Sequence, residues 1–170
     1  MISVDEFIEK MIELVQWYIE NRERLVIEAA FDLSDETKQR VINKGLNADG
    51  QKIGDYSEPY RTQKEARGRL SVNVDGINYR DSQEMYKSVF PRTESIDQNQ
   101  ITVSIKADSK VRSDGSGLTN EQVMDYLEFL TDKGIHNGYP IEFSLDEEQA
   151  TVKHVIEAIQ AKAKELGLIK

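Results

Sequence analysis

The acids and two histidines are the side chains of this chain most capable of chemistry, because the sequence contains no cysteine. Without cysteine there is no thiol nucleophile, no thiolate zinc site and no disulfide scaffold. His136 and His154 lack the HExxH spacing that places two zinc ligands and a general base on one helix. We interpret His154 as a helix-surface or boundary residue rather than as a metal ligand.

Two glycines raise the possibility of a calcium-binding loop. Gly50 or Gly115 could be the sixth residue of an EF-hand loop, in which the first residue supplies a carboxylate. That first residue would be Gly45 or Lys110, and neither has a carboxylate. We therefore exclude both calcium loops.

One adjacent carboxylate pair could bind magnesium. Asp146 and Glu147 stand at the expected start of a helix, however, where the helix dipole favours negative charge without any metal. The sequence also lacks a GxSxG nucleophile motif and a glycine-rich phosphate loop. We expect no catalytic residue, no metal, no cofactor and no small-molecule substrate.

A group of tyrosines and bases in the middle of the chain is the best candidate for a binding surface. Its members are Tyr56, Tyr60, Arg61, Lys64, Arg67 and Arg69. Tyrosine and arginine are enriched in protein interfaces, and aromatic and basic residues together also bind nucleic acid. We favour a protein interface over an ordinary exposed loop, and either of these over a nucleic-acid surface.

The charge distribution explains why nucleic acid is the least favoured partner. The net charge is −9. Residues 1–45 carry 10 acids and 6 bases, residues 46–118 carry 11 of each, and residues 119–170 carry 10 acids and 5 bases. Acidic ends repel a phosphate backbone, so the charge serves mainly to keep the chain in solution.

The chain length and the apolar and capping patterns predict one α+β domain over residues 1–170 to position these residues. In it, a small antiparallel sheet lies between amphipathic helices. The N-terminal helical region, residues 1–46, begins at a capping box formed by Ser3 and Glu6. Apolar residues then recur at helical spacing over roughly 4–31, which predicts one long helix or two in tandem. A further helix is expected to start at Ser34 and to stop at Gly45.

Residues 47–69 are expected to form an irregular loop, and residues 70–170 the sheet and C-terminal helices. Alternating runs around Asp75-Gly76 predict a hairpin, and the alternation over 101–107 predicts a clear strand. A capping box at Asp81 predicts a short helix ending before Pro91. The polar segment 108–117 predicts a mobile loop.

Two helices and one short strand are expected near the C-terminus. Thr119 and Gln122 form a capping box for a helix that ends before Gly134. The segment 139–143 is a candidate edge strand, because Pro140 cannot donate to a ladder. Asp146 and Gln149 are expected to cap a long amphipathic helix that stops at Gly167. No secretion signal and no membrane span are expected.

The order of motifs between Leu46 and Phe90 resembles that of phage virion-morphogenesis proteins, the tail-completion or head-tail joining group. The segment LNADGQKIGDYSEPY matches a "DG" turn and a Tyr/Thr/Lys-rich loop, and YRDSQEMYKSVF matches a helix start of the "L-x-D-T-G-x-M-x-x-S" type. Downstream, YLEFLTDKG is similar to the family's late "YA-x-x-x-E-x-G" element. Gln83 replaces the family's usual glycine, and Ser82 its usual threonine.

The resemblance implies a non-enzymatic α+β subunit that forms a ring with copies of itself and contacts other phage head or tail proteins. Its expected location is the host cytoplasm during assembly and then the virion neck or tail. Two alternatives remain open. One is a metal-dependent hydrolase or nuclease that uses acidic residues, and the other is a bacterial adaptor module that binds a protein through its long helices.

Overall fold

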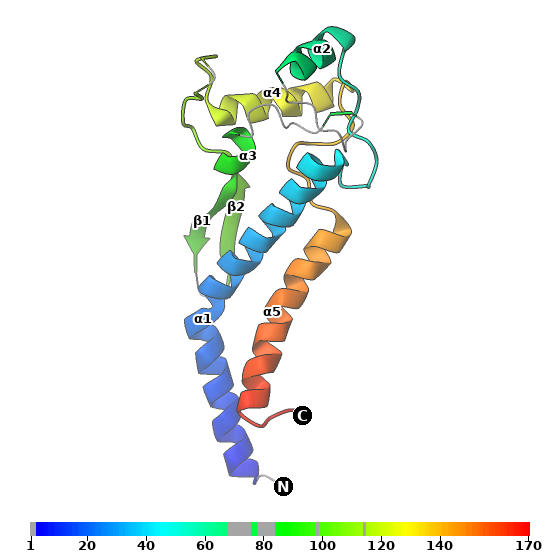
Figure 1. The fold of residues 1–170 in the computed structure, drawn as a ribbon. Coiled ribbons are helices and arrows are strands. Elements are labelled where there is room, and N and C mark those ends of the chain that lie inside the picture. The colour runs from blue at the N-terminus through cyan, green and yellow to red at the C-terminus, as the bar shows by residue number, and fades with distance from the viewer. Residues whose placement is uncertain (1–2, 68–75, 78–83, 98, 114) are drawn as a thin grey trace.

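The computed structural model describes residues 3–67, 76–77, 84–97, 99–113 and 115–170. A long helix, α1 (Val4–Gln39), is followed by helix α2 (Glu58–Ala66), short helix α3 (Glu84–Ser88), strands β1 (Phe90–Ile96) and β2 (Ile101–Lys106), helix α4 (Asn120–Asp132) and helix α5 (Leu145–Glu165). Helices α1 and α5 run antiparallel side by side, whereas α2 and α4 lie at the opposite end from both termini (Figure 1). The expected α+β class is confirmed.

Helix α1 is one continuous helix, so the prediction of a new helix at Ser34 is wrong. Ser3 caps α1 by accepting the backbone N–H of Glu6 at 3.2 Å. Ser34 lies inside the helix and is buried. Buried Leu25, Ala29 and Thr37 extend the same helical spacing past Ser34, and this packing outweighs the capping tendency of a serine.

A π-helical turn, η1 (Arg40–Lys44), extends α1, and Gly45 ends it as expected. Gly45 adopts φ 66°, a left-handed conformation that glycine reaches without steric cost, and its N–H donates to the Val41 carbonyl. The wider turn carries Arg40, whose side chain reaches helix α5. This end of α1 therefore connects the long helices to the rest of the fold.

Strands β1 and β2 form the antiparallel pair of the described residues and lie along α1. The predicted strand over 101–107 is confirmed as β2, whereas β1 was not predicted. The sequence did not indicate β1 because Pro91 lies in it and proline is uncommon in strands. Proline is tolerated at a sheet edge, which is where β1 holds it. A register shift between Thr93 and Ser95 marks a bulge in β1.

The main apolar core lies where η1, α3 and α4 meet, at the α2 and α4 end of the molecule. Its buried members are Val41, Ile53, Ile77, Met85, Tyr86, Val89, Ala107 and Met124. Tyr86 is fully buried, and its hydroxyl donates to the Pro140 carbonyl at 2.9 Å. The core therefore holds one end of the long helices and leaves their other end outside it.

Two predicted segments differ from the structure. Residues 47–69 are not wholly irregular, since helix α2 occupies Glu58–Ala66 with Pro59 in its first turn, where proline is favoured. Residues 139–143 form no strand, because the Pro140 carbonyl bonds to Tyr86 and the Glu142 carbonyl accepts from Arg40. Most of the predicted hairpin around Asp75-Gly76, and the Asp81 cap, lie outside the described residues.

The two C-terminal helices largely follow their predicted boundaries. The Thr119–Gln122 capping box is present at α4, with both hydrogen bonds made. Helix α5 is capped by Ser144 with Glu147, not by Asp146 with Gln149, because Ser144 holds the extended backbone that a cap requires. Gly167 follows α5 in a left-handed conformation. None of the described helices is long and apolar enough to cross a membrane.

Candidate protein interface

Helix α2 and the turn before it bring three of the predicted interface residues together. Tyr56, Tyr60 and Lys64 follow one another at four-residue spacing, which places them on one side of the chain. The rings of Tyr56 and Tyr60 are 5.3 Å apart between centroids. Lys64 Nζ donates to the Tyr56 hydroxyl at 2.6 Å and lies 4.2 Å from the centre of the Tyr56 ring. Tyr56 thus holds the ammonium group, and Tyr60 packs against Tyr56.

Lys64 is not the exposed base that the sequence suggested. Only 2% of the residue is accessible to solvent. An ammonium group survives burial only when its charge is stabilised, and the hydroxyl and ring of Tyr56 contribute to that here. Lys64 therefore shapes the tyrosine cluster from within instead of adding an exposed positive charge.

The other three predicted interface residues do not join this cluster in the described structure. Arg61 is exposed and lies 3.7 Å from Glu65 in an ion pair along α2. Arg67 is exposed at the C-terminal cap of α2. Arg69 lies outside the described residues. The predicted surface is therefore divided, with a tyrosine cluster on one side and Arg61 and Arg67 exposed outside it.

The tyrosine cluster forms one wall of a pocket of about 690 Å³. Helix α4 and the loops around it supply the other walls. The lining includes Asp55, Tyr56, Tyr60, Lys64, Ile77, Met85, Arg112, Leu118, Val123, Tyr126, Leu127, Leu130, Ile135 and His136. Such a mixture of aromatic and aliphatic walls with a few polar groups is typical of sites that accept an apolar anchor.

Charged groups at the pocket are mostly basic or neutral. Arg112 and Lys64 are cationic, whereas Asp55 is paired with Lys52 at 2.5 Å. Burial lowers the pKa of His136, which keeps its imidazole neutral near pH 7. We refer to this site as the tyrosine pocket. It offers aromatic and aliphatic contact beside a few polar groups.

Sequence reasoning missed the half of the pocket that comes from α4 and its flanking loops. Tyr126 and Leu130 stand at four-residue spacing, which indicated a helix face but not its neighbour. Leu118 and His136 come from loops before and after α4. No local pattern reveals that these segments meet α2, because the contact is made by the tertiary fold.

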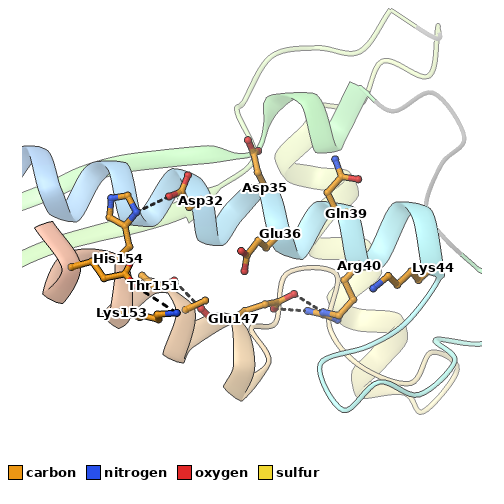
Figure 2. Close-up of a pocket in the computed structure, with 12 residues that line it drawn as sticks. Asp32, Asp35, Glu36, Gln39, Arg40, Lys44, Glu147, Thr151, Lys153 and His154 are labelled. Carbon is orange, nitrogen blue, oxygen red and sulfur yellow. Dashed lines mark hydrogen bonds and ion pairs between the residues drawn. The ribbon is translucent and has the colours of Figure 1, made fainter.

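A second hollow, of about 710 Å³, lies between the C-terminal half of α1 and the start of α5 (Figure 2). Arg40 Nε donates to Glu147 Oε1 at 2.8 Å, and Thr37 donates to Glu147 Oε2 at 3.1 Å. Both charged side chains are largely buried. Burial alone would raise the pKa of Glu147, but hydrogen bonds from Arg40, Ser144 and Thr37 outweigh it and lower the pKa.

Two further acids of this hollow lie beside basic side chains. Asp32 lies 3.2 Å from His154 Nδ1, and Asp35 is paired with Lys38 at 2.7 Å. Glu147 is thus a buried, ion-paired acid at the start of α5, not the solvated acid that the sequence suggested. Among the described residues no group of three or more acids and histidines is placed to hold a metal ion. We interpret the buried pair of Arg40 and Glu147 in this hollow as a contact that holds α1 against α5.

The N-terminal half of α1 carries a large apolar surface that the described chain leaves uncovered. Eight apolar residues at helical spacing are between 39% and 74% exposed: Val4, Phe7, Ile8, Met11, Ile12, Val15, Tyr18 and Ile19. The sequence indicated an apolar helix face here but not that it stays outside the core. Contiguous exposed apolar surface of this kind marks an interaction site. We call it the α1 face.

Comparisons of the sequence with protein-family models and with curated proteins, and of the fold with solved structures, give no match.

Proposed function

We propose that this chain is a non-enzymatic structural subunit of a phage or prophage particle. It acts in head-tail joining or tail completion through contacts with copies of itself and with other head or tail proteins. The phage assignment rests on the motif resemblance between Leu46 and Phe90. The assembly role rests on one observation, the uncovered α1 face.

The α1 face supports an assembly role because its exposure would be unfavourable in a chain that works alone. Fully burying one large aliphatic side chain stabilises a protein by about 1.5–3 kcal/mol. Five aliphatic side chains, together with Phe7, Met11 and Tyr18, stand partly exposed on this part of α1 in the isolated subunit. A subunit built for a larger particle covers this surface when it meets its neighbours.

The hollow between α1 and α5 fits this role better than it fits catalysis. Glu147 is paired with Arg40, Asp35 is paired with Lys38, and Asp32 lies beside His154, so these carboxylates contact side chains of the same fold. A metal-dependent hydrolase needs carboxylates that converge on an ion. The proposal therefore assigns no reaction to the chain.

An adaptor module that binds one partner through its long helices is the second candidate. The same α1 face favours it, because an amphipathic helix also docks into a groove of another protein. The two functions differ in stoichiometry. A particle subunit forms rings or larger assemblies of its own copies, whereas an adaptor forms a complex of fixed size with a different chain.

The test is the mass of the purified protein by light scattering over a range of concentrations. We expect the wild type to form large assemblies and Ile8→Gln/Ile12→Gln to remain monomeric, because the substitutions remove apolar contact without changing charge. Ile96→Gln, an exposed isoleucine at the end of β1, is the matched control and should assemble like the wild type.

Two further observations decide between the candidates. Electron micrographs of the assembled protein should show rings, and neighbouring genes should encode portal and tail proteins. A wild-type chain that stays monomeric at every concentration, and that is absent from particles made by its host, would overturn the proposed function.

A further inference from the structure

The backbone of strand β2 bonds to β1 through its even-numbered residues. Pro91 of β1 faces Ile105 and has no N–H, so these two residues do not form a hydrogen-bonded pair. In the turn, Asp97 N–H donates to the Gln100 carbonyl at 2.9 Å, so residue 100 bonds across the hairpin. Because the residues of a strand bond alternately to its two sides, residues 101, 103 and 105 direct their N–H and C=O groups away from β1.

This outer edge of β2 can accept a further strand. Within the described part of the chain, no hydrogen bond uses its outward N–H and C=O groups. The outer edge of β1, by contrast, contains Pro91, a bulge and the exposed charges of Arg92 and Glu94. Prolines, bulges and charges prevent an edge from pairing. Strand β2 has no proline and no charge before Lys106, so its edge lacks this protection.

We propose that β2 of one copy pairs with β2 of a second copy, antiparallel and about a two-fold axis at Val103. The sequence identifies this occupant, because Ile-Thr-Val-Ser-Ile over residues 101–105 reads nearly the same in both directions. In this register Ile101 faces Ile105 of the second copy, and Thr102 faces its Ser104. Cross-strand pairs of β-branched residues and of hydroxyl residues stabilise a sheet.

The same register matches the backbone groups and the two faces of the strand. The pairs 101 with 105 and 103 with 103 join residues whose N–H and C=O groups face the outer edge, so each pair can exchange two hydrogen bonds. Ile105 packs against the apolar core, whereas the Ser104 hydroxyl donates to Glu94 on the exposed face. Apolar side chains therefore meet apolar ones and hydroxyls meet hydroxyls. A shift by one residue would mix the two faces.

Charge and space also favour a second copy at this edge. Residues 90–106 carry two acids and two bases, so the hairpin is neutral in a chain whose net charge is −9. Both strands contact α1, and a two-fold axis perpendicular to the sheet leaves the two α1 helices on the same side of it. Neighbouring strands lie about 4.8 Å apart, so the two hairpins would be about 10 Å apart, which is the usual distance between packed helices.

This contact is isologous and is separate from the α1 face. Two five-residue strands alone bury less than the roughly 1,200 Å² of a stable interface. We therefore expect the strands to pair between copies that the α1 face holds together, and in this respect the inference rests on the proposed function. A two-fold contact combined with a second contact joins pairs of copies into a larger closed assembly.

The absence of cysteine makes disulfide formation a clean test of the register. Thr102→Cys is prepared with a mass tag and Ser104→Cys without one, and each alone and the mixture are treated with a mild oxidant. Facing residues of a non-hydrogen-bonded pair have Cα atoms about 4.5 Å apart, which a disulfide spans, so the mixed dimer should be at least about tenfold more abundant than either dimer of one variant. Ser95→Cys, on the partner position of β1, replaces Ser104→Cys in the control mixture and should give no dimer.

Four results separate this contact from the proposed function. A dimer of Thr102→Cys with itself as abundant as the mixed dimer, or an equal product with Ser95→Cys, would overturn the contact. Assembly by light scattering without the mixed disulfide would overturn it while the proposed function stands. The mixed disulfide in a chain that builds no larger particle would support the contact and contradict the proposed function. A wild type that never self-associates would overturn both.

A charged variant of β2 provides a second measurement. Thr102→Lys/Ser104→Lys places lysines opposite each other at two points of the contact and should raise the concentration needed for half-assembly at least about tenfold. Thr93→Lys/Ser95→Lys adds the same charge at exposed positions of β1 and should assemble like the wild type. Circular dichroism should show the same fold for both variants. Equal effects of the two variants on assembly would contradict pairing through β2.

Discussion

At the residue scale, the pair of Arg40 and Glu147 is the most consequential contact outside the core. Its partners come from the end of α1 and the start of α5, more than a hundred residues apart in sequence. The side chains are 12% and 9% exposed, so removing either would leave the other charge buried without its partner. The pair therefore fixes how the two long helices meet.

We expect Glu147→Gln to lower the free energy of unfolding by about 3 kcal/mol at neutral pH, because the Arg40 charge loses its partner. The measurement is urea unfolding followed by circular dichroism. Asp35→Asn, which breaks an exposed pair with Lys38, is the control and should cost less than about 1 kcal/mol. Comparable losses for the two variants would contradict the importance of the buried pair.

The pH dependence has a definite sign. The pKa of Glu147 is lowered in the folded protein, so its contribution is complete above the ordinary carboxyl pKa and is lost as pH falls through the lower folded pKa. The stability difference between wild type and Glu147→Gln should therefore shrink on acidification below the ordinary carboxyl pKa. A difference that stays constant would show that ionisation of Glu147 does not contribute.

At the element scale, the two long helices differ in how their faces are used. The C-terminal half of α1 buries Leu25, Ala29 and Ala30, and α1 packs on α5 and the hairpin. The N-terminal half keeps its apolar residues exposed. The apolar residues of α1 thus pack within the fold in its C-terminal half. In our proposal, those of its N-terminal half contact other subunits.

The strand and the loop that follows it should differ in local stability. Residues 101–106 belong to the β1–β2 ladder, whereas few backbone bonds hold the described part of 108–117, such as that from Arg112 N–H to the Leu118 carbonyl. We expect fast amide exchange in 108–113 and 115–117 and slower exchange in 101–106, measured by mass spectrometry on the monomeric variant. Strong protection throughout the loop would contradict the prediction of a mobile segment.

At the scale of the whole molecule, a net charge of −9 opposes association of identical copies. Salt screens that general repulsion and would by itself favour assembly. Salt also screens any attraction between opposite charges across a subunit contact. The direction of the salt effect therefore reports which interaction dominates.

We expect salt to strengthen assembly of the wild type, because the α1 face is apolar and the copies that meet through it carry the same net charge. Light scattering at increasing sodium chloride concentrations measures this. Glu9→Gln/Glu20→Gln, which removes two exposed acids of α1, should assemble more than the wild type at low salt, and the difference should narrow at high salt. Assembly that weakens steadily with salt would indicate attraction between opposite charges instead.

The sequence by itself determined the features that depend on residues close together in the chain. Spacing, capping and glycine conformation predicted the α+β class, strand β2 and the Thr119 cap. They also predicted that the first helical region ends at Gly45 and the last helix at Gly167. These signals are local, because hydrogen bonds within a turn or a ladder depend on neighbouring residues.

Only the tertiary structure decided which of the patterned faces are covered. It buried Lys64 against Tyr56, paired Arg40 with Glu147, and carried α1 through Ser34 without a break. It also left the α1 face exposed and placed α4 across from α2 to form the tyrosine pocket. An apolar stripe has the same sequence pattern whether its partner is the same chain or another copy, so the pattern alone cannot distinguish a core from an interface.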